Sequence, residues 1–101
     1  MKYLLQSRLP LAVYGVAELY DYSQVVTHNA IINIFNPIYS SVPIQSLVHH
    51  QIVNIFIVEN IKIVFLFENG AFMYVSLICD DYTGPEACTI TFSDGKCVVI
   101  D

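Results

Sequence analysis

The chain has 101 residues, of which 55% are hydrophobic and 13% are charged, and its nine acidic and four basic residues give a net charge of −5. Folded proteins average about 25% charged residues, so this composition excludes a disordered chain, which is rich in charge and poor in apolar groups. The basic residues are scattered (Lys2, Arg8, Lys62 and Lys96). Binding to a phosphate backbone needs clustered cations, so no nucleic-acid partner is expected. The length suits a single β-rich domain over residues 1–101.

The N-terminal half is predicted to form mainly extended elements. Residues 2–6 predict a short edge strand, whereas residues 10–20 fit either a strand or a helix. A turn over residues 20–23 precedes residues 24–35, whose β-branched side chains favour a strand. Asn36-Pro37 then ends this element, because the residue before a proline avoids the α-helical region.

Residues 41–50 carry the clearest helical pattern. Ile44, Leu47 and Val48 fall on one face of a helix. Pro43 suits a first helical turn, because the backbone N–H groups of that turn make no hydrogen bond within the helix and proline lacks one. We therefore expect one short helix near residues 43–50.

Residues 52–79 predict three β-strands joined by tight turns. The strands are expected at 52–58, 61–67 and 71–79, with tight turns at Glu59-Asn60 and Glu68-Asn69-Gly70. Asn-Gly between two apolar runs favours a two-residue type I′ turn. A sheet with one face in water alternates polar and apolar residues, but these strands are apolar on both faces, so both faces need to be covered.

Two-residue turns would divide the side chains of this meander between an aromatic and an aliphatic face. The aromatic face would consist of Phe56, Phe65, Phe67, Phe72 and Tyr74. The aliphatic face would include the predicted interface of a homo-oligomer, which consists of Val64, Leu66, Met73, Val75 and Leu77.

The C-terminal part is predicted to form an acidic loop and a final hairpin. The loop residues expected to bind a protein partner are Asp80, Asp81, Tyr82 and Glu86. A two-residue turn at Asp94-Gly95 would place Cys88 and Cys97 on one face of the hairpin, too far apart for a disulfide. With Cys79 the count is odd. We therefore expect free thiols and a cytoplasmic location, which is a reducing compartment.

These patterns favour an α+β fold, a predominantly antiparallel β-sheet of five to seven strands with one short helix near 43–50; the alternative is an all-β sandwich or barrel. The expected function is that of a small acidic protein-interaction module without catalytic activity, of the inhibitor, immunity or anti-defence type, which self-associates through an apolar sheet face. Two alternatives stay open: a small-molecule-binding β-barrel lined by aromatics, and an enzyme with a Cys/His centre. No metal, cofactor or membrane partner is expected, because zinc-type spacings and long apolar runs are missing from the sequence.

Overall fold

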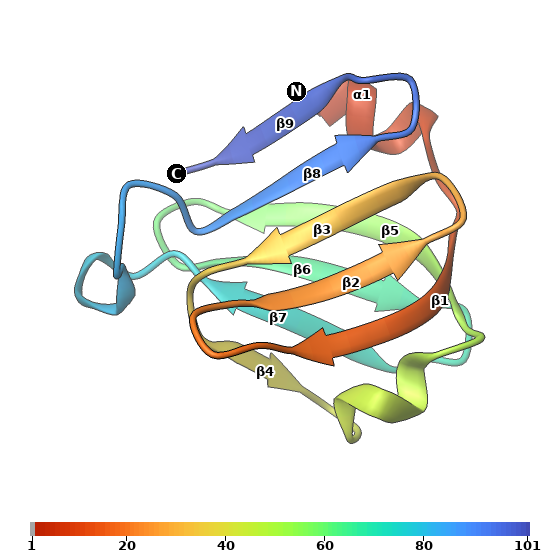
Figure 1. The fold of residues 1–101 in the computed structure, drawn as a ribbon, viewed down its shortest axis with the longest axis horizontal. Coiled ribbons are helices and arrows are strands. Elements are labelled where there is room, and N and C mark those ends of the chain that lie inside the picture. The colour runs from red at the N-terminus through yellow and green to blue at the C-terminus, as the bar shows by residue number, and fades with distance from the viewer. Residues whose placement is uncertain (1) are drawn as a thin grey trace.

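A computed structural model describes residues 2–101, with side chains from Leu5 onward, and Figure 1 shows that its strands form two facing layers. The elements in chain order are α1 (Lys2–Ser7), β1 (Leu11–Glu18), β2 (Ser23–Thr27), β3 (Ala30–Ile34), β4 (Ile38–Ser40), the 3₁₀ turn η1 (Ile44–Leu47), β5 (Gln51–Val58), β6 (Lys62–Phe67), β7 (Phe72–Ser76), the 3₁₀ turn η2 (Cys79–Asp81), β8 (Cys88–Phe92) and β9 (Cys97–Ile100). All pairings between neighbouring strands are antiparallel.

The two layers belong to one sheet that folds over at β1. Its strand order is β4-β7-β6-β5-β1-β2-β3-β8-β9. The start of β1 pairs with β5, and the rest of β1 pairs with β2 after a bulge between Val13 and Gly15. We call β4, β7, β6 and β5 the back layer, and β1, β2, β3, β8 and β9 the front layer (Figure 1).

The predicted predominantly antiparallel β fold is confirmed, but five to seven strands is too few, because the described chain contains nine. The sheet ends at β4 and β9 and is not closed, so the barrel alternative is wrong. Part of the miscount comes from residues 24–35, which form two strands joined by a turn at His28-Asn29 rather than one element. Thr27 stabilises this turn, because its Oγ1 accepts a hydrogen bond from Ala30 N at 2.9 Å and donates to Ala30 O at 2.8 Å.

Residues 2–6 were predicted as an edge strand, and this prediction was wrong. They lie in the helix α1, which packs beside β5. Leu5 is only 3% exposed and belongs to the core, and Gln6 Nε2 donates to Ile55 O at 2.8 Å. The local sequence fits either conformation, so these contacts with the sheet decide it. Residues 10–20, which the sequence left open, contain strand β1.

The predicted helix near 43–50 is reduced to the 3₁₀ turn η1. Val48 returns to extended geometry with ψ 135°, and His49 adopts a positive φ of 75°. His49 N donates to Val13 O at 2.8 Å, and Val13 N donates to His50 O at 2.9 Å. The backbone after Leu47 therefore pairs with β1, which replaces the hydrogen bonds that a longer helix would have made.

The hairpin loops at 59–61, 68–70 and 93–95 each contain three residues, one more than the two-residue turns from which the faces of the strands were predicted. Val58 pairs with Lys62, and Leu66 pairs with Phe72 around a loop closed by a hydrogen bond from Gly70 N to Phe67 O at 3.1 Å. Gly70 has φ 86°, but Asn69 does not share the positive φ that a type I′ turn requires at both positions. A type I turn followed by a left-handed glycine, which needs three residues, fits these angles.

The last hairpin has the same longer loop. Thr91 pairs with Cys97 and Cys88 with Ile100, while Gly95 has φ 92°. One additional loop residue moves every side chain of the following strand to the opposite face. Cys88 is therefore buried and Cys97 exposed, so the prediction that they share a face was wrong.

The core lies between the layers and draws large aliphatic side chains from both. Leu11, Ile32 and Ile90 from the front layer are 0% exposed, as are Phe65 and Met73 from the back layer. This interior explains why the inward positions of both layers are apolar, because burying each such side chain contributes about 1.5–3 kcal/mol.

Replacing Gly70 or Gly95 by Ala should lower the free energy of unfolding by about 1 kcal/mol each, because L-residues rarely adopt their positive φ. No atom lies within 4 Å of an added Cβ at either position, so the loss should come from backbone conformation alone. Gly84→Ala is the matched control, since Gly84 also has open space and its φ is outside the left-handed region. Urea denaturation measures the difference, and an equal loss at Gly84 would contradict the explanation.

All three cysteines are free thiols, but they should differ in reactivity. Burial raises the pKa of Cys88 to about 12, whereas Cys79 and Cys97 are exposed. Because the thiolate is the reactive form, a thiol reagent at neutral pH should modify two cysteines in the native protein and all three in denaturant. Fewer than three in denaturant without reductant would show that a disulfide forms.

Candidate functional site

The structure separates the five residues predicted as an oligomer interface. Met73 and Val75 are 0% exposed and lie in the core with Leu77, whereas Val64 and Leu66 lie on the outer side of the back layer. The prediction that they share one face was wrong, because both loops of the meander are one residue longer than expected. Of these five residues, a second copy of the chain could contact Leu66 without opening the core, whereas Val64 at 6% exposure is already covered.

The five predicted aromatic residues do not share a face either. Phe65 is 0% exposed and Phe67 3% exposed within the core, but Phe56 and Phe72 are 41% and 39% exposed on the outer side, where Tyr74 also lies. These five residues therefore do not line a common ligand cavity inside the sheet.

The outer side of the back layer is mainly apolar and partly exposed: Val64 at its centre is 6% exposed, whereas Phe56 and Phe72 beside it are 41% and 39% exposed. We call it the apolar outer face, and it consists of Tyr39, Val53, Phe56, Val64, Leu66, Phe72 and Tyr74. Its central row crosses all four strands, because Phe56 pairs with Val64, Val64 with Tyr74, and Tyr74 with Tyr39. The Tyr39 and Tyr74 rings stack at 5.0 Å between centroids, and Lys62 Nζ lies 4.6 Å from the Tyr74 ring centroid.

The outer side of the front layer is more polar. Gln24, Asn33, Thr89 and Thr91 occupy positions that alternate with buried residues, and Gln24 Nε2 donates to Asn33 Oδ1 at 2.9 Å. This alternation is typical of a sheet face in water. The two outer sides of one sheet therefore differ: the back layer exposes the rings of Tyr39, Phe56 and Phe72, whereas the front layer combines polar side chains with Ile31 and Val99, each 41% exposed.

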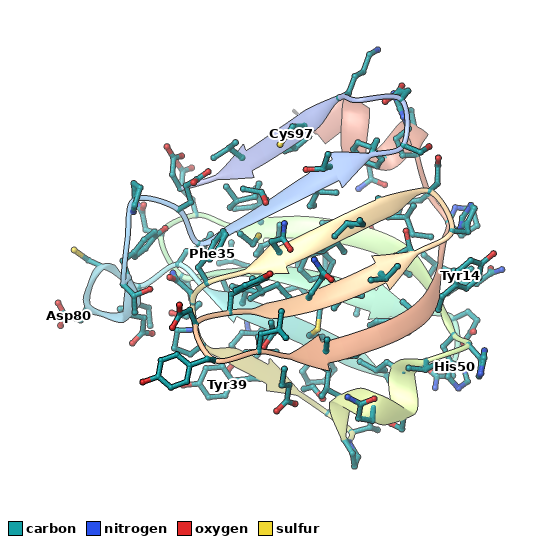
Figure 2. The ribbon with its side chains drawn as sticks, viewed as in Figure 1. Tyr14, Phe35, Tyr39, His50, Asp80 and Cys97 are labelled. Carbon is teal, nitrogen blue, oxygen red and sulfur yellow. The ribbon has the colours of Figure 1, made fainter. Side chains whose placement is uncertain are left out.

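The four residues of the predicted partner-binding loop have different environments. Figure 2 shows Asp80 at the outer end of the loop, where it is exposed. Tyr82 packs against the core, where burial and the nearby Asp101 carboxylate raise the pKa of its hydroxyl. The Asp81 carboxylate accepts a hydrogen bond from the Ser76 hydroxyl, and Glu86 is half-buried.

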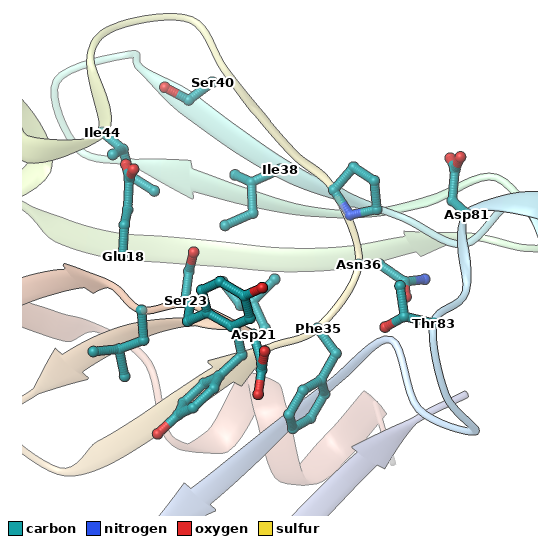
Figure 3. Close-up of a pocket in the computed structure, with 15 residues that line it drawn as sticks. Glu18, Asp21, Ser23, Phe35, Asn36, Ile38, Ser40, Ile44, Asp81 and Thr83 are labelled. Atoms are coloured by element: carbon teal, nitrogen blue, oxygen red, sulfur yellow. The ribbon is translucent and has the colours of Figure 1, made fainter.

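A pocket of about 530 Å³ lies between the β1–β2 turn, the β3–β4 connection and the 79–86 loop (Figure 3). Its lining residues are Glu18, Leu19, Tyr20, Asp21, Tyr22, Ser23, Ile34, Phe35, Asn36, Pro37, Ile38, Ser40, Ile44, Asp81 and Thr83. Three carboxylates and no basic residue are in this set. Sequence reasoning identified only Asp81 among them, because the other segments are far apart in the chain.

Ser76 holds two walls of this pocket together. Its N–H donates to Pro37 O at 3.1 Å, and its carbonyl oxygen accepts from Asn36 Nδ2 at 2.8 Å. Its hydroxyl donates to Asp81 and accepts from Ile78 N at 3.1 Å. At 2% exposure, Ser76 links the β3–β4 connection to the 79–81 turn through a buried hydrogen bond from Asn36 and partly buried ones with Asp81 and Ile78.

Asn36 has an unused hydrogen-bond acceptor. Its side chain is 4% exposed, and its Oδ1 is the buried side-chain atom that has no hydrogen-bond partner among the residues the structure describes. The amide orientation is determined by the Ser76 carbonyl, which needs the NH₂ group as its donor. Leaving such an acceptor unpaired costs about 1–3 kcal/mol, so a hydrogen-bond donor at this position would be stabilising.

The predicted alternative of a Cys/His centre has little geometric basis. His50 Nδ1 lies 3.1 Å from the Glu68 carboxylate. The pKa of Glu68 is lowered mainly by the hydrogen bond from the Gln51 backbone N–H, and His50 lowers it further. The Cys88 thiol is buried with a raised pKa, which disfavours a nucleophilic thiolate. Within residues 2–101, no three His, Cys, Asp or Glu side chains are grouped so that they could hold a metal ion.

Asp81→Ala should lower the free energy of unfolding by about 1–2 kcal/mol, because the buried Ser76 hydroxyl would lose its acceptor. Asp80→Ala removes the same charge from the same loop at an exposed position and should leave stability nearly unchanged. Thermal denaturation of the two variants tests this difference. Equal stability of both variants would show that the Ser76–Asp81 hydrogen bond contributes nothing.

None of the helices in the described part of the chain has the length and apolar character needed to cross a membrane. The chain matches no protein-family model, no curated protein and no solved structure. Its function therefore has to be argued from its own residues and geometry.

Proposed function

We propose that this protein is a small binding protein without chemistry of its own, which self-associates through the apolar outer face and contacts a protein partner with its acidic end. The observation that carries the proposal is the contrast between its two outer sides: the back layer exposes aromatic rings, whereas the front layer carries polar side chains among its exposed aliphatic ones. An exposed apolar surface of this kind is typical of an interaction site.

The distribution of charge favours a second copy of this chain as the occupant of the apolar outer face. Lys62 is the charged residue on the outer side of β6, and its ammonium group already lies over the Tyr74 ring. The strands β4 to β7 contain no carboxylate on this side. Two chains of net charge −5 can therefore meet there without bringing acidic groups together.

The acidic end of the molecule is separate from the strands that form this face. Glu18 at the end of β1, Asp21 in the β1–β2 turn and Asp80 in the 79–86 loop are exposed. Figure 1 shows that this turn and this loop lie at the same end of the molecule. Exposed carboxylates accelerate encounter with a basic protein more than they increase affinity, and salt screens this effect. This arrangement supports a molecule that associates with its own copy on one side and binds a basic partner at its end, as an inhibitor or immunity protein would.

Phe56→Glu should convert the associated protein to monomers, because the substitution places a carboxylate in the centre of the proposed interface. Ile31→Glu is the matched control: Phe56 and Ile31 are both 41% exposed on strands, but Ile31 lies on the polar outer side of the front layer. Light scattering at high micromolar concentration measures the mass of each protein. A monomeric wild type, or dissociation by Ile31→Glu alone, would contradict the proposal.

A further inference from the structure

The strand β9 has a free edge along which another strand could pair. It is the last strand in the sheet order, and no described strand pairs with its outer edge. Phe92 N donates to Lys96 O at 2.8 Å, so the carbonyl group that precedes β9 faces β8. Hydrogen-bonding groups alternate between the two sides of a strand in an antiparallel pair, so the N–H and C=O groups of Cys97 and Val99 lie along the free edge.

The other edges of the described sheet are protected against such pairing. The opposite edge strand, β4, has three residues and lies between Pro37 and Pro43. Pairing of β5 with β1 ends at Ile52, and beyond it β5 lies beside α1, where Gln6 Nε2 donates to Ile55 O at 2.8 Å. Short edge strands, prolines and covering helices are means by which proteins prevent edge-to-edge pairing.

β9 lacks the charges, prolines and bulges that would protect its edge. Its four residues, Cys97–Ile100, contain no charged side chain and no proline, and they pair with β8 without a change of register. Cys97 and Val99 are exposed on the outer side, opposite Thr91 and Thr89 of β8. An uncharged edge beside β-branched side chains favours the addition of another strand.

The charges around β9 favour a basic segment of a protein partner over a second copy of this chain. Figure 1 shows that the C-terminal end of β9 lies at the same end of the molecule as the 79–86 loop. Burial, and then the Asp101 carboxylate, raise the pKa of Tyr82, so this carboxylate lies near that loop. A second copy would bring another chain of net charge −5 to this end, whereas a basic segment would bring cations to its carboxylates.

We propose that an extended segment of a protein partner binds to β9 as an additional strand, antiparallel to β9 and with basic residues at its N-terminal end. Neighbouring strands of the sheet pair only in the antiparallel direction, and this direction places the N-terminal end of the added segment beside Asp101. This inference rests on the proposed function, since it describes how the acidic end binds its partner. It is independent of self-association, because the apolar outer face belongs to the back layer.

The test uses NMR of the ¹⁵N-labelled protein with the peptide acetyl-Lys-Arg-Val-Thr-Val-Thr-Val amide. The amides of Cys97 and Val99 should exchange rapidly with solvent in the free protein and become protected when the peptide binds. The amide of Val98, which faces β8, should be protected in both states. A peptide of reversed sequence should bind about fivefold more weakly, because antiparallel pairing places its cations away from Asp101.

Methylated peptides separate strand addition from attraction by charge alone. N-methylation of the valines or of the threonines removes alternate sets of N–H groups and leaves both cations in place. Only one set can face β9 in an added strand, so one methylated peptide should bind about tenfold more weakly and the other should bind like the parent peptide. Equal binding of both would leave a charge-based contact at the acidic end, as the proposed function requires, and would overturn strand addition.

A pair of variants locates the edge on the protein. Val99→Pro removes an N–H from the free edge and none from the pairing with β8, so it should weaken peptide binding by about tenfold. Val99→Ala shortens the same side chain and keeps the N–H, so it should weaken binding by about twofold at most. Equal weakening by both variants would assign the effect to the side chain and overturn the proposal. Thermal denaturation checks that both variants fold, and the methylated peptides test the wild type if Val99→Pro does not.

Two further outcomes would also overturn the proposal. Protection of the Cys97 and Val99 amides without peptide, increasing with protein concentration, would show that a second copy occupies the edge. Absence of binding by the parent peptide would show that β9 accepts no such strand. Light scattering of the same samples measures self-association through the apolar outer face, so failure of strand addition is distinguished from failure of that part of the proposed function.

Discussion

The length of three hairpin loops is the constraint on which the rest of this structure depends. In two of them, Gly70 and Gly95 adopt positive φ at the third loop position, which only a residue without Cβ does at low cost. This third residue determines which side of each following strand faces the interior. Because of it, Phe65 and Met73 enter the core while Phe56 and Tyr74 remain outside.

The consequence is a sheet whose two outer sides have different characters. The front layer buries one face and exposes a more polar one, as an antiparallel sheet in water normally does. The back layer buries one apolar face and exposes a second, where Tyr39 and Tyr74 stack and Lys62 lies over a ring. Removing apolar surface from water is favourable, so contact of this exposed face with another molecule would lower the free energy further.

Ser76 has a comparable role at the acidic end of the molecule. Its backbone and hydroxyl groups together contact residues 36–37 and 78–81, which are about forty residues apart in sequence, so that two connections form one wall. Hydrogen bonds buried in this way are strong, and their orientation leaves the Asn36 oxygen without a partner. The pocket is therefore a product of the hydrogen bonding that closes this end of the sheet.

The sequence by itself determined the β-rich class, the positions of most strands and turns, and the acidic character of the 80–86 loop. These properties are local, since β-branched residues favour extended backbone and Asn-Gly or Asp-Gly favours a turn wherever it occurs. Only the tertiary structure decided the loop lengths, the side of each strand that is buried, the helix at residues 2–7 and the shortening of the predicted helix at 43–50. Strands that are apolar on both faces fit the core in either register, so their pattern does not select one. The pocket was beyond sequence reasoning for a related reason: Glu18, Asn36 and Asp81 become neighbours only when the two layers pack together.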